Sequence, residues 1–170
     1  MLAFVLILLG MGGCGYTTGS ILPGNYKTLY VEPFKNSVNY LTEGSRTSYI
    51  PLMESKVRSA IIDRFMFDGH LRIAKSDVAD LVLKGELISF EREELRMTDN
   101  QDVQEYRIRV TISLTIIDTV TGDEFVKEPS FAGEASYFTS GPQAKSESAA
   151  IEEALTDLSR RVVERTIENW

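Results

Sequence analysis

The sequence has only one cysteine and one histidine, and this shortage excludes several kinds of functional site. Cys14 has no second cysteine with which to form a disulfide inside the chain. Zinc sites usually need several cysteine or histidine ligands, so we expect no metal site. A Ser-His-Asp triad would depend wholly on His70, which follows Asp68 and Gly69 at a predicted helix end, a position typical of a turn histidine.

The sequence also lacks the short motifs of common enzyme classes. It contains no G-x-S-x-G, S-x-x-K, H-E-x-x-H, P-loop or C-x-x-C pattern. Carboxylates gather at Glu91, Glu93 and Glu94, and again at Glu152 and Glu153. These groups fall at a strand end and on a helix surface, which is typical of solvated charge and not of a carboxylate pair that faces a cleft. We therefore expect a protein that is not an enzyme.

Basic residues are in the minority. The 18 lysines and arginines face 25 aspartates and glutamates, which gives a net charge of −7. A field of this sign argues against nucleic acid as the main partner. The 170 residues, of which 43% are apolar, are typical of one ordinary globular domain that buries its core without disulfides.

Charge is absent from the N-terminal segment, which begins with an apolar run from Met1 to Leu9. This run is shorter than the roughly 17–25 residues that a membrane-spanning helix needs, so it is typical of a signal peptide. Gly12 and Gly13 stand directly before Cys14, and a peptidase that cuts beside a cysteine requires such small residues. The arrangement resembles the lipobox of bacterial lipoproteins, with Met11 where leucine is usual.

This resemblance implies that residues 1–13 are a lipoprotein signal peptide and that Cys14 becomes the acylated N-terminus of the mature chain. The positively charged start is missing, so we expect the true start to lie upstream or to be misassigned. Stable membrane anchoring requires two signals, such as two acyl chains, and acylation of Cys14 would meet this requirement. The residue after the cysteine is Gly15 and not aspartate. By resemblance to enterobacterial sorting rules, this indicates that the lipoprotein is anchored on the periplasmic side of the outer membrane. The alternative is an apolar N-terminal strand or helix with Cys14 as a buried thiol.

Beyond the cysteine, we predict a lipidated tether over residues 14–25 and a single domain over residues 26–170. Hydrophobic periodicity predicts two helices in this domain. Pro51 and Gly69 suit the two ends of the first helix, and Ser146 is a candidate N-cap of the second. The apolar stripe of the first consists of Met53, Val57, Ala60, Ile61 and Phe65, and that of the second of Ile151, Leu155, Leu158 and Val162.

Alternating residues predict the strands. They span residues 26–34, 71–74, 80–91, 103–118 and 124–137. The alternation over 103–118 is the clearest and indicates one face on a core and one in water. Within 80–91, Ile88 and Phe90 fall on the face opposite Leu87, so we expect this strand to twist or to be covered there. Hairpin-length connections make the long strands antiparallel, and two helices on one face of the sheet give a two-layer α+β sandwich.

Five basic residues are candidates for binding phosphate groups, because arginine presents a planar fork that matches phosphate. They are Arg92 and Arg96, where the strand 80–91 ends, Arg107 and Arg109 on the polar face of the next strand, and Lys145 at the start of the last helix. The alternative is that Arg107 and Arg109 pair across strands with Glu86 and similar acids.

Six stretches follow one another along the chain: Cys14–Tyr16, Leu29–Asn36, Asp68–Ile73, Ala79–Leu87, Glu105–Ile108 and Asp118–Gly122. Taken in this order, they resemble the LptE family of lipopolysaccharide-assembly lipoproteins. Each stretch is short, but together they cover nearly the whole mature chain.

The resemblance implies two amphipathic helices packed on one face of a four-stranded, mostly antiparallel sheet, and no cofactor. It also implies an outer-membrane lipoprotein that plugs and helps to assemble the translocon barrel LptD and contacts lipopolysaccharide during its delivery to the outer leaflet. In the family, basic side chains near the strand hairpin and near the start of the last helix bind the lipid. Here Ala144–Lys145 match the helix start, whereas Thr98–Asn100 occupy the hairpin position beside Arg96.

A different interpretation remains open from the residues. The chain would then be a stand-alone outer-membrane lipoprotein that binds a small ligand or another envelope protein. A barrel plug should depend on its partner for stability, whereas a free binding module should not.

Overall fold

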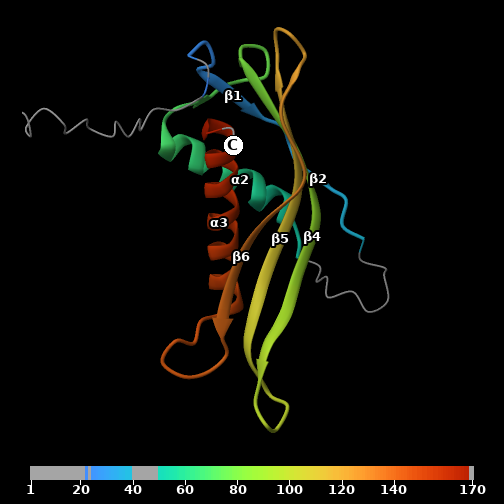
Figure 1. Cartoon of the computed structure of the whole chain (residues 1–170), viewed down its shortest axis with the longest axis vertical. Helices are drawn as coiled ribbons and strands as arrows, with labels where there is room; N and C mark the ends of the chain where they lie inside the picture. The colour runs from blue at the N-terminus through green and yellow to red at the C-terminus, as the bar shows by residue number, and fades with distance from the viewer. Residues whose placement is uncertain (1–21, 23, 40–49, 169–170) are drawn as a thin grey trace, which may run out of the picture.

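The computed structural model describes residues 22, 24–39 and 50–168. The predicted signal peptide of residues 1–13 and the predicted lipidation site Cys14 lie outside the described residues. Figure 1 shows two layers, with a long twisted sheet on one side and both helices packed against the same face of it. None of the helices in this part of the chain combines the length and apolar character needed to cross a membrane.

Three long strands form antiparallel pairs along the molecule. They are β4 (Leu81–Met97), β5 (Val103–Asp118) and β6 (Glu124–Phe138). Three short strands pair in parallel with their neighbours. They are β1 (Thr28–Val31), β2 (Lys35–Asn36) and β3 (Arg72–Ile73). The spatial order is β3–β1–β4–β5–β6, and β2 pairs with β4 beyond the end of β1.

The α+β class and the layer of two helices agree with the prediction, but the sheet requires a correction. It has six strands and is mixed, where four mostly antiparallel strands were expected. The short strand predicted over 71–74 is present as β3, whereas β2, with two residues, is too short to show a periodic pattern. The parallel pairing of β1 with β3 follows from their connection through the helix α2 (Met53–Asp68), because a helical crossover returns the chain in its original direction.

The alternation predicted over 103–118 is confirmed in β5, which has the same bounds. Its apolar side is buried in the core at Ile108, Val110, Ile112, Leu114 and Ile116. Both helices lie on one face of the sheet (Figure 1) and share a core with this apolar side, so the polar side of β5 faces away from them. The central strand therefore separates the core from a hydrophilic outer face of the sheet.

β4 is longer than predicted, and a bulge changes the orientation of its second half. The register with β5 shifts between Leu87 and Ser89, which leaves Ile88 as an extra residue. Phe90 consequently enters the core, whereas Ile88 is 37% exposed. The expectation that these two side chains share a face is wrong for this reason. Arg92 and Arg96 lie within β4 and not beyond its end.

The helix α2 buries one stripe and ends at a glycine, as predicted. Its buried residues are Met53, Val57, Ile61 and Phe65. Gly69 adopts a left-handed conformation with φ 82°, and its N–H donates to the Phe65 carbonyl at 3.0 Å. Pro51 precedes the helix and does not open its first turn, because Leu52 is the N-cap residue.

The helix α3 (Glu147–Glu168) lies along β6 and approaches it closely at a glycine. Ser146 acts as the predicted cap, since its hydroxyl accepts a hydrogen bond from the Ala149 N–H at 3.2 Å. A Cβ atom on Gly133 would lie 2.5 Å from the backbone nitrogen of Leu158 and 2.6 Å from the carbonyl oxygen of Ala154. Only glycine therefore fits at this contact between strand and helix.

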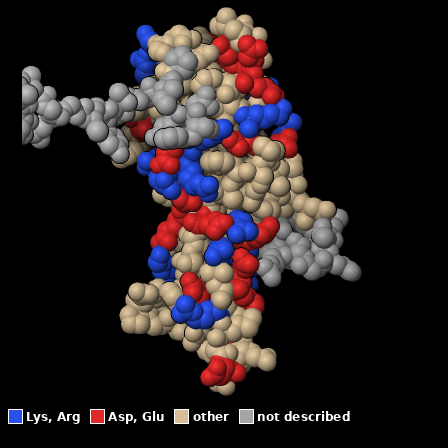
Figure 2. All heavy atoms as spheres, in the orientation of Figure 1, with Lys and Arg blue, Asp and Glu red and all other residues tan. Residues whose placement is uncertain are grey.

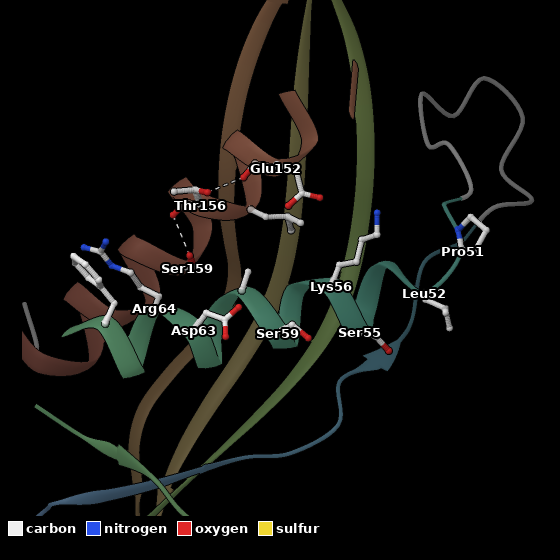
Figure 3. A pocket seen from close by; sticks show the side chains of 13 residues that line it. Pro51, Leu52, Ser55, Lys56, Ser59, Asp63, Arg64, Glu152, Thr156 and Ser159 are labelled. Carbon is white, nitrogen blue, oxygen red and sulfur yellow. Dashed lines mark hydrogen bonds between the residues drawn. The ribbon is translucent and has the colours of Figure 1, made fainter. Parts of the chain in front are cut away.

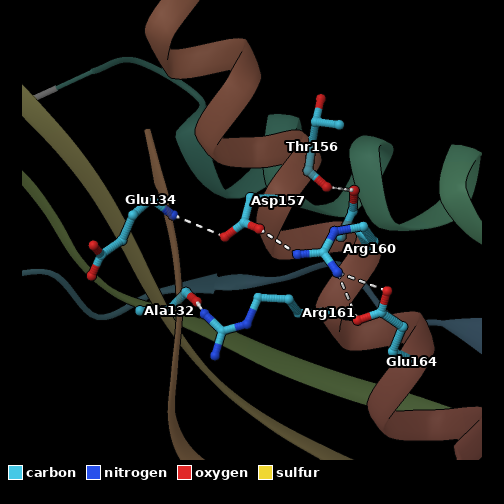
Figure 4. Close-up of polar contacts among 8 residues, drawn as sticks. Ala132, Glu134, Thr156, Asp157, Arg160, Arg161 and Glu164 are labelled. Carbon is cyan, nitrogen blue, oxygen red and sulfur yellow. Dashed lines mark hydrogen bonds and ion pairs between the residues drawn. The ribbon is translucent and has the colours of Figure 1, made fainter. Parts of the chain in front are cut away.

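Side chains of α3 also satisfy backbone groups on the outer edge of β6 (Figure 4). The Glu134 N–H donates to the Asp157 carboxylate at 3.2 Å, and the Arg161 guanidinium donates to the Ala132 carbonyl. The Arg160 Nη2 donates to the Asp157 carboxylate at 2.7 Å, which fixes the position of that carboxylate. Unpaired edge groups invite pairing with other chains, so these contacts protect the edge of the sheet.

Candidate functional site

Arg107 and Arg109 lie on the outer face of the sheet between acidic residues of both neighbouring strands. The Arg109 Nε donates to Glu134 at 2.7 Å, and the Arg107 Nε lies 3.5 Å from the same carboxylate. Arg107 also lies 3.7 Å from Glu93 on β4. The expected cross-strand pairing of Arg107 and Arg109 is thus present. Their partners are Glu93 and Glu134 and not Glu86, because the strand register places these two glutamates opposite the arginines.

We call this surface the charged face, and it comprises Glu93, Arg96, Glu105, Arg107, Arg109 and Glu134. The hydrogen bond that Arg109 donates to Glu134 raises the pKa of Arg109 above its ordinary value, against the opposing effect of burial. Ion pairs that are this exposed contribute little to the free energy of folding. Their main effect is that the positive and negative charges of this face cancel.

Arg96 is the most loosely held arginine of the charged face. Its guanidinium lies 3.7 Å from Glu105, and 61% of its side chain is exposed. It also lies over the ring of Phe138, 5.7 Å from the ring centre. Arg96 is therefore the candidate on this face that an incoming phosphate can reach with the least disruption.

Lys145 lies beside the same phenylalanine. Its backbone N–H donates to the Phe138 carbonyl at 3.1 Å, and its Nζ donates to the two carboxylate oxygens of Glu153 at 2.8 and 2.7 Å. A hollow of about 500 Å³ opens here, lined by Ser136, Tyr137, Phe138, Pro142, Gln143, Ala144 and Lys145. The fold thus brings Lys145 and Arg96 to one segment of β6, although they are far apart in the sequence.

Arg92 is separated from the other arginines, because it projects from the helix-covered side of β4. It donates to Glu147 at the start of α3 at 2.8 Å and lies 4.9 Å from the centre of the Tyr106 ring. The bond to Glu147 raises the pKa of Arg92. Burial, with Glu147 nearby, raises the pKa of Tyr137, whose hydroxyl donates to Glu147 at 3.2 Å. Arg92 therefore ties the hairpin to the helix.

Sequence reasoning did not identify Glu134 and Phe138 as parts of this region. Both belong to β6, and their relation to the arginines depends on its register with β5. The turn at 119–123 was visible in the sequence, and counting outward from it would have brought Glu134 near Arg109. The register shifts within the pair make such counting inexact.

The other titratable and concave features do not assemble a reaction centre. His70 Nδ1 lies 2.8 Å from Asp68, and both residues lie in the turn after α2. Within the described part of the chain, no cluster of three or more histidine, cysteine or carboxylate side chains suits a metal ion. Figure 2 shows basic and acidic side chains intermixed over the face that it presents.

A groove of about 620 Å³ runs between the two helices (Figure 3). Small hydroxyl residues line much of it, including Ser55 and Ser59 on α2. On α3, the Thr156 hydroxyl donates to the Glu152 carbonyl at 2.8 Å, and the Ser159 hydroxyl donates to the Thr156 carbonyl at 3.0 Å. These two hydroxyls therefore already donate hydrogen bonds to carbonyl groups of their own helix.

The model of one protein family, LptE, described as lipopolysaccharide-assembly, matches residues 26–166. The chain belongs to the LptE family. Family membership places it among the outer-membrane lipoproteins of lipopolysaccharide assembly, a non-enzymatic class. The match spans the sheet, both helices and the hollow beside Phe138.

Solved structures support the fold of this LptE family member at low sequence identity. A protein from Xanthomonas campestris is 16% identical with a TM-score of 0.58, and the match covers 85% of each chain. A hypothetical protein from Chlamydia trachomatis is 12% identical with a TM-score of 0.54, over 82% of this chain and 95% of that one. A minor lipoprotein from Acinetobacter baumannii is 15% identical with a TM-score of 0.50, over 82% and 91%. A comparison with curated protein sequences gives no match.

Proposed function

We propose that this LptE family member is anchored through Cys14 on the periplasmic side of the outer membrane and fills the interior of an LptD-like barrel. The observation that carries this proposal is the charged face. It is hydrophilic, it is not covered by either described helix, and its ion pairs leave it nearly neutral. The interior of a large outer-membrane barrel is polar and hydrated, so a surface of this kind suits contact with its inner wall.

The shape of the molecule supports the same proposal. The three long strands and α3 run along one axis, and the β4–β5 hairpin extends beyond the N-terminal end of α3 (Figure 1). An elongated body of this form fits along the axis of a barrel. Side chains of α3 protect the edge of β6, which disfavours the addition of a barrel strand to this edge. The barrel would therefore contact side chains there and would not continue the sheet.

The hollow beside Phe138 is the proposed contact for lipopolysaccharide. Lys145 lines the hollow, and Arg96 lies over the ring of Phe138, which also lines it. Phosphate groups are the anionic part of the ligand that arginine and lysine bind best. Glu153 already neutralises Lys145, so a phosphate must displace that carboxylate. This competition favours weak, reversible contact, which suits a lipid that is passed onward. Arg92, Arg107 and Arg109 serve in the proposal as supporting residues, because carboxylates hold them more firmly.

The lipid contact is tested with Lys145→Asp, measured by lipopolysaccharide binding to the purified mature protein. Charge reversal should repel phosphate, and we expect affinity to fall about tenfold, which corresponds to about 1.4 kcal/mol. The free energy of unfolding should change by less than about 1 kcal/mol, because exposed ion pairs contribute little and aspartate is favourable near a helix N-terminus.

Lys127→Asp provides the matched control for this measurement. Lys127 lies far along β6 from Phe138, is exposed and pairs with Glu124 at 2.9 Å. Its reversal changes the net charge by the same amount but should leave binding unchanged. Equal losses in the two variants would indicate a general effect of charge, and wild-type affinity in Lys145→Asp would remove Lys145 from the site.

A further inference from the structure

Two adjacent large apolar side chains are exposed at the C-terminal end of α2. Phe67 is 80% exposed and Met66 is 65% exposed. Neither belongs to the buried stripe of the helix, and the Arg64 guanidinium lies 5.2 Å from the centre of the Phe67 ring. Apolar side chains grouped on a surface mark a place of interaction, and a nearby arginine is typical of contact with an anionic, partly apolar partner.

Exposed basic residues lie on the side of Met66. Met66 and Arg72 line one shallow depression of about 350 Å³, together with Gly69, Leu71 and Ile73. The Arg72 N–H donates to the Lys27 carbonyl at 2.9 Å, which places the start of β1 directly beside it. Neither Lys27 nor Arg72 forms an ion pair with another described residue. The neighbouring acid Asp68 is already held by His70. We call Arg64, Met66, Phe67, Arg72 and Lys27 the α2 tip.

The proposed anchor precedes the first residue of the α2 tip by a short stretch of chain. Eight residues along the chain separate Cys14 from Leu22, which packs against the core, and Lys27 follows five residues later. A segment of this length spans at most about 29 Å when fully extended. An acyl chain on Cys14 therefore holds the α2 tip near the surface of its own leaflet, at a high effective concentration of lipid.

We propose that the α2 tip rests on the anionic phospholipid surface of the leaflet in which Cys14 is anchored. Phe67 and Met66 enter the headgroup region, where aromatic and flexible apolar side chains are favourable, and Arg72 and Lys27 bind lipid phosphates. The inference rests on the proposed anchor and adds a second point of contact. Two points restrict rotation about the tether, so the β4–β5 hairpin, at the far end in Figure 1, is presented to the barrel in one orientation.

The test uses the mature acylated protein in vesicles of phosphatidylethanolamine and phosphatidylglycerol, some carrying a quencher at the headgroup. An environment-sensitive dye is attached through Met66→Cys. The sulfur of Cys14 is occupied by the anchor, and the chain has no other cysteine, so the new thiol is the single site of labelling. Met97→Cys is the matched control, because Met97 is 52% exposed but lies at the far end of β4.

We expect the dye at position 66 to shift to shorter wavelength and to lose intensity to the lipid quencher, and the dye at position 97 to do neither. Adding Arg72→Glu to the Met66→Cys protein should reduce the quenching. Identical signals at positions 66 and 97 would overturn the proposal, as would a shift at 66 that appears only when a barrel partner is added. A protein that fails to float with the vesicles would contradict the anchor itself, and the orientation with it.

Discussion

Two hydrogen-bonded carboxylates at the start of the sheet make stability depend on pH. Asp80 accepts hydrogen bonds from the Thr28 hydroxyl at 2.7 Å and from the N–H groups of Lys27 and Thr28 at 2.9 Å. The Thr28 hydroxyl is the largest cause of the lowered pKa of Asp80. The Tyr26 hydroxyl, at 2.7 Å, likewise lowers the pKa of Asp118. Both contacts join the first residues of the domain to the long strands.

The sign of the pH effect follows from these two shifts. Below the ordinary aspartate pKa of about 3.9, the unfolded chain takes up protons that the folded chain does not. Above that value these groups contribute their full stabilisation and the contribution does not depend on pH, and we expect the free energy of unfolding to fall as pH decreases toward the folded pKa values. Urea unfolding across this range should show a flatter dependence for Asp80→Asn than for wild type. Asp99→Asn, at the exposed hairpin turn, should leave the dependence unchanged, and equal slopes in Asp80→Asn and wild type would contradict this account.

At the scale of elements, the contact between α3 and β6 depends on one glycine. In Gly133→Ala the new methyl group would meet the backbone of α3 at Leu158 and Ala154, and backbone atoms cannot rotate away as a side chain can. We expect a loss of about 2 kcal/mol in the free energy of unfolding, in the range of overpacked cores. The urea midpoint measures this loss. Gly24→Ala is the control, because no atom lies within 4 Å of its Cβ position, and an equally large loss there would indicate a general effect of replacing glycine.

The sequence predicts the long elements well because each repeats its pattern several times. The alternation in 103–118 gave the bounds of β5, and Ser146 and Gly69 marked helix ends that the structure confirms. The face of Phe90 was not predictable in this way, because one bulged residue, Ile88, reverses the alternation after it. The partners of Arg107 and Arg109 depend on register between strands, which no local pattern encodes. That Arg96 and Lys145 both contact Phe138, one at its ring and the other at its backbone carbonyl, depends on the fold as a whole.

At the scale of the whole molecule, the structure divides into parts with different surfaces. The outer side of the sheet has compensated charges, the hollow beside Phe138 is lined in part by Lys145, and the α2 tip exposes Phe67 and Met66. The net charge of −7 suits a plug in a polar barrel better than a tight binder of an anionic lipid. In this account the lipid contact is therefore secondary to the contact with the barrel.

The measurement that tests this account most directly is co-purification of the tagged, full-length protein from its own envelope in mild detergent, with the partners identified and quantified by mass spectrometry. If the protein fills a barrel, we expect recovery of a large β-barrel protein in a near one-to-one ratio with the LptE family member. Recovery of the lipoprotein alone, under conditions in which other outer-membrane complexes stay intact, would contradict the barrel role. It would support instead a stand-alone module that binds a small ligand or another envelope protein.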